Sequence, residues 1–443
     1  MRFEDPLEWD RQIRQCSQLA DRYRRTLKTD PVSADPSGPF VGVPFVTTRA
    51  AFAEIRAMPE ILPIRESLLR WAFQLAEARV NADLERHLAR AWRAETIVVD
   101  TSRPIRTTRA DLLTRSLSDS LARGMWLEEL GRQLDGMTDW VSLLWQRRDE
   151  LAKRAGFDGL VAAIEPVDSL EACVGRWLLN STGAARAAWP RDPVAYLEIS
   201  LSNGAREGWP AHVTAQSMVS LLGTRTWFAR SVREPRWPRL IGPTSFLRAL
   251  YRLGRELARS WAAATHPFVT AHEAGGLTEH RLGWLMASLT LNQDWQQRIL
   301  GVNKDRAREQ VRDLSRAFLC RGHGLCLKTR LTRAAADSGA SLKSAFAENM
   351  HEILGFDLPS AFAGQLPQLE LDSAQCLVGF WLGCSDHARL RGTFEADWFR
   401  NPRAIETVLE ESGAVRSVPL GPENIEKHQA AACAWLMECL EGC

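Results

Sequence analysis

Lysine and tyrosine are scarce in this sequence, and each shortage limits what the protein can be. Only six of the 56 basic residues are lysines, and they form no run. The net charge is +2, so the composition favours neither nucleic acid nor an anionic membrane surface as a partner. The three tyrosines are Tyr23, Tyr196 and Tyr251, so the last part of the chain has none.

Long apolar runs and a cysteine framework are also missing. No uninterrupted apolar stretch approaches the ~18 residues that a membrane-spanning helix needs. The N-terminal residues 1–6 do not have the basic-then-apolar pattern of a secretion signal. The nine cysteines are odd in number and scattered, which is not the arrangement of a disulfide-stapled secreted domain. We therefore expect a cytoplasmic protein with no membrane segment.

Helical periodicity is the dominant pattern. Apolar residues recur at three- and four-residue steps in 68–75, 112–121, 143–151 and 282–289. One weakly alternating segment, 193–201, stops at the turn residues Ser202-Asn203-Gly204. The sequence therefore predicts a mainly α protein with one small β-sheet near 192–215.

Several segments resemble helical zinc peptidases. Residues 148–157 (RDELAKRAGF) resemble a helix of their N-terminal lobe, and 246–258 (FLRALYRLGRELA) resembles the helix that carries their His-Glu-x-Gly-His motif, including Gly254. Residues 264–269 resemble the stretch after that helix, and Glu279 stands at about the spacing of the third zinc ligand. Over about residues 140–415 the chain is therefore similar to the oligoendopeptidase F and thimet oligopeptidase family.

The resemblance implies an architecture. We expect a two-lobed, gluzincin-like helical fold around a deep cleft. Three consecutive regions are expected: an N-terminal helical region (1–140), a helical lobe with the small sheet (141–240), and the former catalytic lobe with the C-terminal helices (241–443).

The zinc chemistry of the family is nevertheless erased. Tyr251 stands at the first histidine, Arg252 at the catalytic glutamate and Arg255 at the second histidine, and only Glu279 remains of the former metal site. Guanidinium groups cannot ligate and would repel a dication, so we expect no cofactor and no peptide cleavage. An arginine at 252 or 255 is then expected to pair with Glu279, to be solvated, or to bind a peptide carboxylate.

The implied function is that of an inactive peptidase homologue. It would bind a peptide or protein partner in the ancestral cleft, as an accessory subunit or as a peptide-holding factor for a companion enzyme. An extended peptide would add to the strand that contains Ile199, and an aromatic side chain such as Trp209 would contact it. The candidate substrate-binding residues are Arg252, Arg255, Ile199 and Trp209.

Two alternative hypotheses keep an enzymatic activity. In the first, the chain holds zinc at a rebuilt site that acts on a peptide-like substrate, because thiolate and imidazole groups suit zinc. Its candidate ligands are either His266, His272, His280 and Glu279, or Cys320, His323 and Cys326. The second set is explained more simply by small buried cysteines in a packed helix. In the other hypothesis the cleft acts without a cofactor, through Glu279, Tyr251 and the arginines.

Overall fold

The computed structural model describes residues 6–36, 45–59, 64–94, 96–97, 105–106, 120–165, 170–188, 209, 243–265, 267–337, 341–363, 370–415 and 421–441. Within these ranges the protein is mainly helical, as predicted. Their strands are β1 (Thr96–Ile97) and β2 (Ile105–Arg106), which pair antiparallel. Apart from Trp209, the sheet predicted near 192–215 lies outside the described residues. None of the helices in these ranges combines the length and the apolar character needed to cross a membrane.

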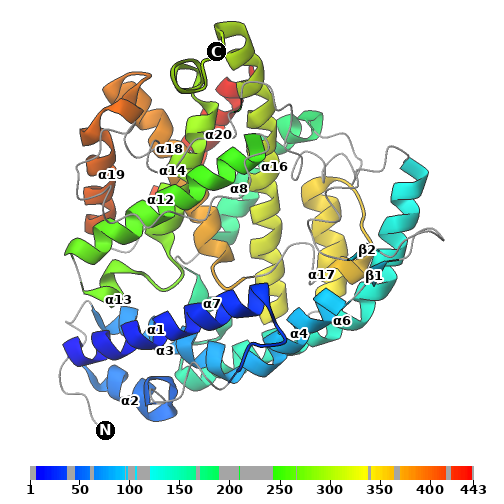
Figure 1. Ribbon diagram of the computed structural model, residues 1–443, viewed down its shortest axis with the longest axis vertical. Coiled ribbons are helices and arrows are strands. Elements are labelled where there is room, and N and C mark those ends of the chain that lie inside the picture. Colours follow the sequence, from blue (N-terminus) through cyan, green and yellow to red (C-terminus); the bar gives the residue numbers. More distant parts are fainter. Residues whose placement is uncertain are drawn as a thin grey trace. The chain divides into compact units, whose positions relative to one another are not determined.

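The chain forms two compact units that interleave along the sequence (Figure 1). Unit 1 comprises residues 1–164, 267–274 and 327–371, and unit 2 comprises 165–266, 275–326 and 372–443. The chain thus leaves unit 1 and returns to it twice, whereas the three predicted regions were consecutive.

Unit 1 is built from helices of very different length. Its elements are α1 (Pro6–Thr29), η2 (Phe45–Thr47), α2 (Arg49–Ala57), α3 (Ile64–Val80), α4 (Ala82–Ala94), β1, β2, α6 (Ser120–Ala155), α7 (Leu160–Ile164), α13 (Phe268–Ala271), the last part of α16 (Lys304–Ala336), α17 (Leu342–Asn349), η5 (Met350–Leu354) and η6 (Ser360–Phe362).

Helix α1 shows how periodicity builds unit 1. Its buried side chains follow one another at alternating steps of four and three residues, which places them on one face: Trp9, Ile13, Cys16, Ala20 and Tyr23. At the end of this face the Tyr23 hydroxyl donates to the carbonyl oxygen of Ala82, 2.9 Å away.

Residues 148–155 form the end of α6, and Gly156 and Phe157 follow it. Gly156 has a φ of 82°, and the amide of Phe157 donates to the carbonyl of Ala152 at 3.0 Å, which closes the helix. One turn earlier, the buried Arg148 binds Glu77 of α3 through Nε at 2.6 Å and Glu85 of α4 through Nη2 at 3.1 Å. Arg148 therefore joins three helices of unit 1 by ion pairs.

Unit 2 contains the elements α8 (Leu170–Ala188), α12 (Pro243–Thr265), α14 (Leu277–Ser288), η3 (Leu289–Leu291), α15 (Gln293–Trp295), η4 (Gln296–Leu300), α16 up to Cys326, α18 (Ser373–Phe394), η7 (Trp398–Arg400), α19 (Pro402–Val415) and α20 (Pro422–Glu441).

Helix α14 is the central helix of unit 2, since it packs against both α12 and α18 (Figure 1). All of its residues from Thr278 to Ser288 are buried. An aromatic cluster extends this core: the ring of Phe380 lies edge-on to Trp284 and to Trp177, with centroids 5.1 and 5.7 Å apart.

Burial of one histidine in α18 predicts a pH-dependent stability. His387 stacks on Trp435, its Nδ1 lies 2.8 Å from the Ser288 hydroxyl, and burial lowers its pKa to about 3. In the unfolded chain the same group takes up a proton near its ordinary pKa of 6.5. The unfolded state therefore binds more protons between pH 6.5 and 3, and the free energy of unfolding falls as the pH decreases through this window.

His387→Gln removes this titrating group. We therefore expect the slope of the free energy of unfolding against pH to decrease by about 1.4 kcal/mol per pH unit, the value for one proton. Urea unfolding of both proteins between pH 7 and 5 measures it. His428, whose pKa burial also lowers, is present in both proteins and cancels in the comparison. Parallel pH dependences in the two proteins would contradict the prediction.

Candidate functional site

Four arginines lie on one side of α12. They are Arg248, Arg252, Arg255 and Arg259, spaced by four, three and four residues, so they share a helix face. The helix begins at Pro243, where proline at the first position fits because its missing N–H would have no partner in the helix. We refer to these four residues as the arginine face.

A buried carboxylate binds two members of this face. Oε2 of Glu279 lies 3.0 Å from Nη2 of Arg255 and 2.8 Å from Nη2 of Arg259. Glu279 is in the first turn of α14 and is only 8% exposed. Of the alternatives left open by the sequence, the structure shows the ion pair with Glu279, for Arg255. Arg259, the second partner of Glu279, was not singled out from the sequence. Pairing offsets the high energetic cost of burying a charged carboxylate.

The residues present do not fit a zinc ion. The resemblance would put the metal between positions 251, 255 and 279, where two guanidinium groups contact the Glu279 oxygen that would have to ligate. The hydroxyl of Tyr251 is hydrogen-bonded to Nδ1 of His280 instead of facing Glu279. Guanidinium groups have no lone pair for a metal and repel one, so the ion pairs stand where a ligand set would be needed.

A chain of polar contacts starts at Tyr251, beside the ion pairs of Glu279. His280 contacts the Tyr251 hydroxyl through Nδ1 and the Asp372 carboxylate through Nε2, at 3.1 Å from Oδ2. The same hydroxyl lies 3.7 Å from Sγ of Cys376 in the first turn of α18. Tyr251 and Glu279 were candidates from the sequence and His280 was part of the alternative metal set, whereas Asp372 and Cys376 were not singled out.

The charges of this polar chain support one another. Burial lowers the pKa of His280, but the neighbouring Cys376 and Asp372 outweigh it and raise the pKa to about 9. Burial raises the pKa of the Cys376 thiol, but the His280 imidazolium and its hydrogen bond bring it below the ordinary value. Burial and the negative charge of Cys376 raise the pKa of Tyr251, so its hydroxyl stays protonated.

Glycines bring the three helices of the site close together. A Cβ at Gly254 would lie 2.2 Å from the carbonyl oxygen of Leu282, and a Cβ at Gly379 would lie 2.5 Å from Cβ of His280. The backbones of α12 and α18 therefore approach α14 as only glycine permits. Gly275 and Gly276, with φ values of 91° and 66°, turn the chain into α14 just before Glu279 and His280.

The other sequence candidates lie in different surroundings. Arg252 is exposed on α12. Trp209 is buried and packs on Phe246 with ring centroids 5.2 Å apart, which is a core contact. Ile199 and His266 lie outside the described residues. His272 belongs to unit 1, where its carbonyl oxygen accepts from the indole of Trp71 at 2.6 Å.

The second alternative metal set lies on α16, which continues as a helix through Gly322 and Gly324. Cys320, His323 and Cys326 are all buried, and Nε2 of His323 lies 2.9 Å from the hydroxyl of Ser181. In the part of the chain that the structure describes, no three His, Cys, Asp or Glu side chains are arranged to hold a metal ion.

No family model matches the chain, and no curated protein matches it. The chemistry of the site is therefore argued from its own residues.

Proposed function

We propose that the chain is a metal-free counterpart of helical zinc peptidases that binds a peptide or protein partner without cleaving it. The observation that carries the proposal is the double ion pair of Arg255 and Arg259 with Glu279. It lies where the resemblance places the catalytic metal. With the Lewis acid and the metal-bound water replaced by ion pairs, the hydrolytic step loses both of its main contributions. The groups available for binding are the guanidinium groups of the arginine face.

The four guanidinium groups on one face of α12 favour an acidic ligand. Glu279 pairs with Arg255 and Arg259, and Glu256 lies 2.8 Å from Arg259. Arg252 is exposed, so a ligand in solution can reach its side chain. Planar guanidinium groups bind carboxylates through two parallel hydrogen bonds, so an acidic side chain or a peptide C-terminus is the matching group. Such a protein would act as a peptide-holding factor or an accessory subunit of a companion enzyme.

The absence of hydrolysis is tested by metal analysis and a cleavage assay. Protein purified without chelator is expected to contain no stoichiometric zinc and to leave a quenched-fluorescence peptide mixture intact. One zinc per chain together with cleavage that a chelator abolishes would overturn the proposal.

Binding is tested by reversing one charge. For a fluorescein-labelled peptide of alternating glutamate and glycine, Arg252→Glu is expected to weaken binding about tenfold, which corresponds to about 1.4 kcal/mol. Fluorescence anisotropy measures this, and the affinity should fall as salt is added. Arg403→Glu is the matched control, because Arg403 is also exposed but lies on α19. Equal affinities of the two variants would show that the arginine face is not the binding surface.

A further inference from the structure

Cys376 lies in a setting that differs from that of the other cysteines of the chain. It is half-buried in the first turn of α18, whereas the seven other cysteines described are buried. Its neighbours in unit 2 are Tyr251 of α12, His280 of α14 and Asp372, the residue that precedes α18. We propose that Cys376 is a nucleophilic thiolate that reacts with hydroperoxides and that Tyr251 supplies the proton for this reaction.

The hydrogen bonds form a continuous path to the sulfur. With His280 protonated, Nε2 donates to Asp372 Oδ2 at 3.1 Å and Nδ1 donates to the Tyr251 oxygen. The Tyr251 hydroxyl proton is then free to point to Sγ of Cys376, 3.7 Å away. This path resembles the arrangement of an activated nucleophile, in which a base holds the attacking group and a third residue orients the base.

The charges around the sulfur favour its anionic form. The groups that act on the sulfur are the His280 imidazolium, the Asp372 carboxylate and the Tyr251 hydroxyl. The imidazolium stabilises the thiolate more strongly than the Asp372 carboxylate destabilises it. The N-terminal end of α18 adds a favourable dipole, which also stabilises thiolates.

The reaction balances with the groups present. The thiolate attacks one oxygen of the hydroperoxide ROOH, so that an S–O bond forms as the O–O bond breaks. Sulfur loses two electrons and the peroxide gains them, which gives a sulfenic acid and an alkoxide or hydroxide. The leaving oxygen takes the proton of the Tyr251 hydroxyl, and His280 Nδ1 returns a proton to Tyr251. The products are the sulfenic acid, neutral His280 and the alcohol or water.

A hydroperoxide is the substrate class that this geometry serves best. It requires one thiolate and one acid beside it, and both are present at Cys376 and Tyr251. Hydrogen peroxide is also the most compact hydroperoxide, which suits a residue that is only partly exposed. Burial without such partners has the opposite effect on other thiols: it raises the pKa of Cys16 to about 11, and it raises the pKa of Cys433.

The test compares the same thiol in the folded and unfolded chain. Reduced protein is treated with hydrogen peroxide, the sulfenic acid is trapped with dimedone, and each cysteine is quantified by mass spectrometry. Cys376 is expected to react about tenfold faster in the native protein than in urea, because its thiolate fraction is larger. Accessibility alone would make the native thiol slower, so a native rate equal to or below the unfolded rate would overturn the proposal.

The role of Tyr251 is tested with a second electrophile. Tyr251→Phe keeps the ring that packs on Trp284 and is expected to slow the peroxide reaction about a hundredfold. Chloroacetamide is the control, because chloride leaves without a proton and its reaction depends on the thiolate population alone. An equal loss with both reagents would overturn the assignment of Tyr251 as the proton donor.

The positioning role of His280 is tested through Asp372→Asn, since Asp372 is 30% exposed and its replacement is compatible with folding. Asp372 supports the imidazolium, but its own charge also raises the pKa of the thiol. Because the imidazolium lowers the thiol pKa more than the Asp372 charge raises it, the pH at which the chloroacetamide rate is half-maximal is expected to rise in this variant. An unchanged pH profile in a folded variant would contradict this role. Circular dichroism of both variants shows whether the fold is retained.

Discussion

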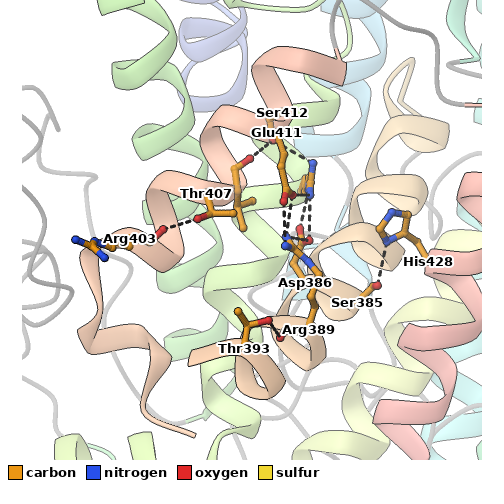
Figure 2. A network of polar contacts seen from close by, with 11 residues as sticks. Ser385, Asp386, Arg389, Thr393, Arg403, Thr407, Glu411, Ser412 and His428 are labelled. Carbon is orange, nitrogen blue, oxygen red and sulfur yellow. Dashed lines mark hydrogen bonds and ion pairs between the residues drawn. The ribbon is translucent and has the colours of Figure 1, made fainter. Parts of the chain in front are cut away.

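Asp386→Ala is expected to lower the free energy of unfolding of unit 2 by about 3–5 kcal/mol. Asp386 is fully buried on α18, within the polar network that Figure 2 shows. It binds Arg281 of α14 through two hydrogen bonds, at 2.6 Å from Nε and 3.0 Å from Nη2. Arg389 approaches the same carboxylate at 3.0 Å. Removing the carboxylate leaves the buried Arg281 with only Glu411 and Ser412, at 3.3 and 3.2 Å. The desolvated guanidinium is then poorly compensated.

The matched control breaks an ion pair on the surface. Glu438→Ala removes the partner of Arg391, 3.0 Å away, and both side chains are more than 40% exposed. We expect a loss of at most about 1 kcal/mol, because water and salt already screen this pair. Urea unfolding at pH 7 measures both variants. Equal losses would show that burial does not set the strength of the network in Figure 2.

Gly254→Ala is expected to destabilise unit 2 by about 3 kcal/mol, the upper end of the cost of overpacking. The new Cβ would meet the carbonyl oxygen of Leu282 at 2.2 Å and its carbonyl carbon at 2.6 Å. These are backbone atoms of a buried helix, so they cannot move aside as a flexible side chain would. Helices α12 and α14 would have to separate, which would also draw Tyr251 away from His280.

Gly392→Ala is the control for this substitution. Gly392 also lies within a helix, α18, but no atom lies within 4 Å of the Cβ that alanine would add. There the gain in helix propensity should stabilise the protein by about 0.5–1 kcal/mol. The two glycine substitutions are thus expected to have opposite signs in thermal unfolding. A Gly254→Ala protein as stable as the wild type would mean that the helices are not held at this distance.

The helical character of the chain followed from local pattern. The expected helix at 246–258 lies within α12, and the apolar steps at 282–289 fall in α14 and η3. The pairing of Arg255 with Glu279 was also within reach, because the resemblance related two positions 24 residues apart. In each case the information lay in one helix or in two helices close in sequence.

The polar chain around Cys376 could not be predicted, because its residues are far apart in the sequence. His280 and Asp372 are 92 residues apart, and Tyr251 and Cys376 are 125 residues apart, with no motif that relates them. The sequence did contain an indirect signal: Gly379 and Gly383 are four residues apart and therefore share one face of α18. Such a pair indicates close approach of another backbone, but it does not identify which helix approaches.

Three successive polar residues of α14 contact three different sets of partners. Glu279 binds the arginines of α12, His280 contacts Tyr251 and Asp372, and Arg281 reaches Asp386 and Glu411. An entirely apolar helix in this position could turn about its axis or slide by a residue and still find contacts of similar energy. Any such movement of α14 would separate all three residues from their partners at once. The triplet therefore selects one rotation and one register for the central helix, and with them the alignment of the arginine face and of Cys376.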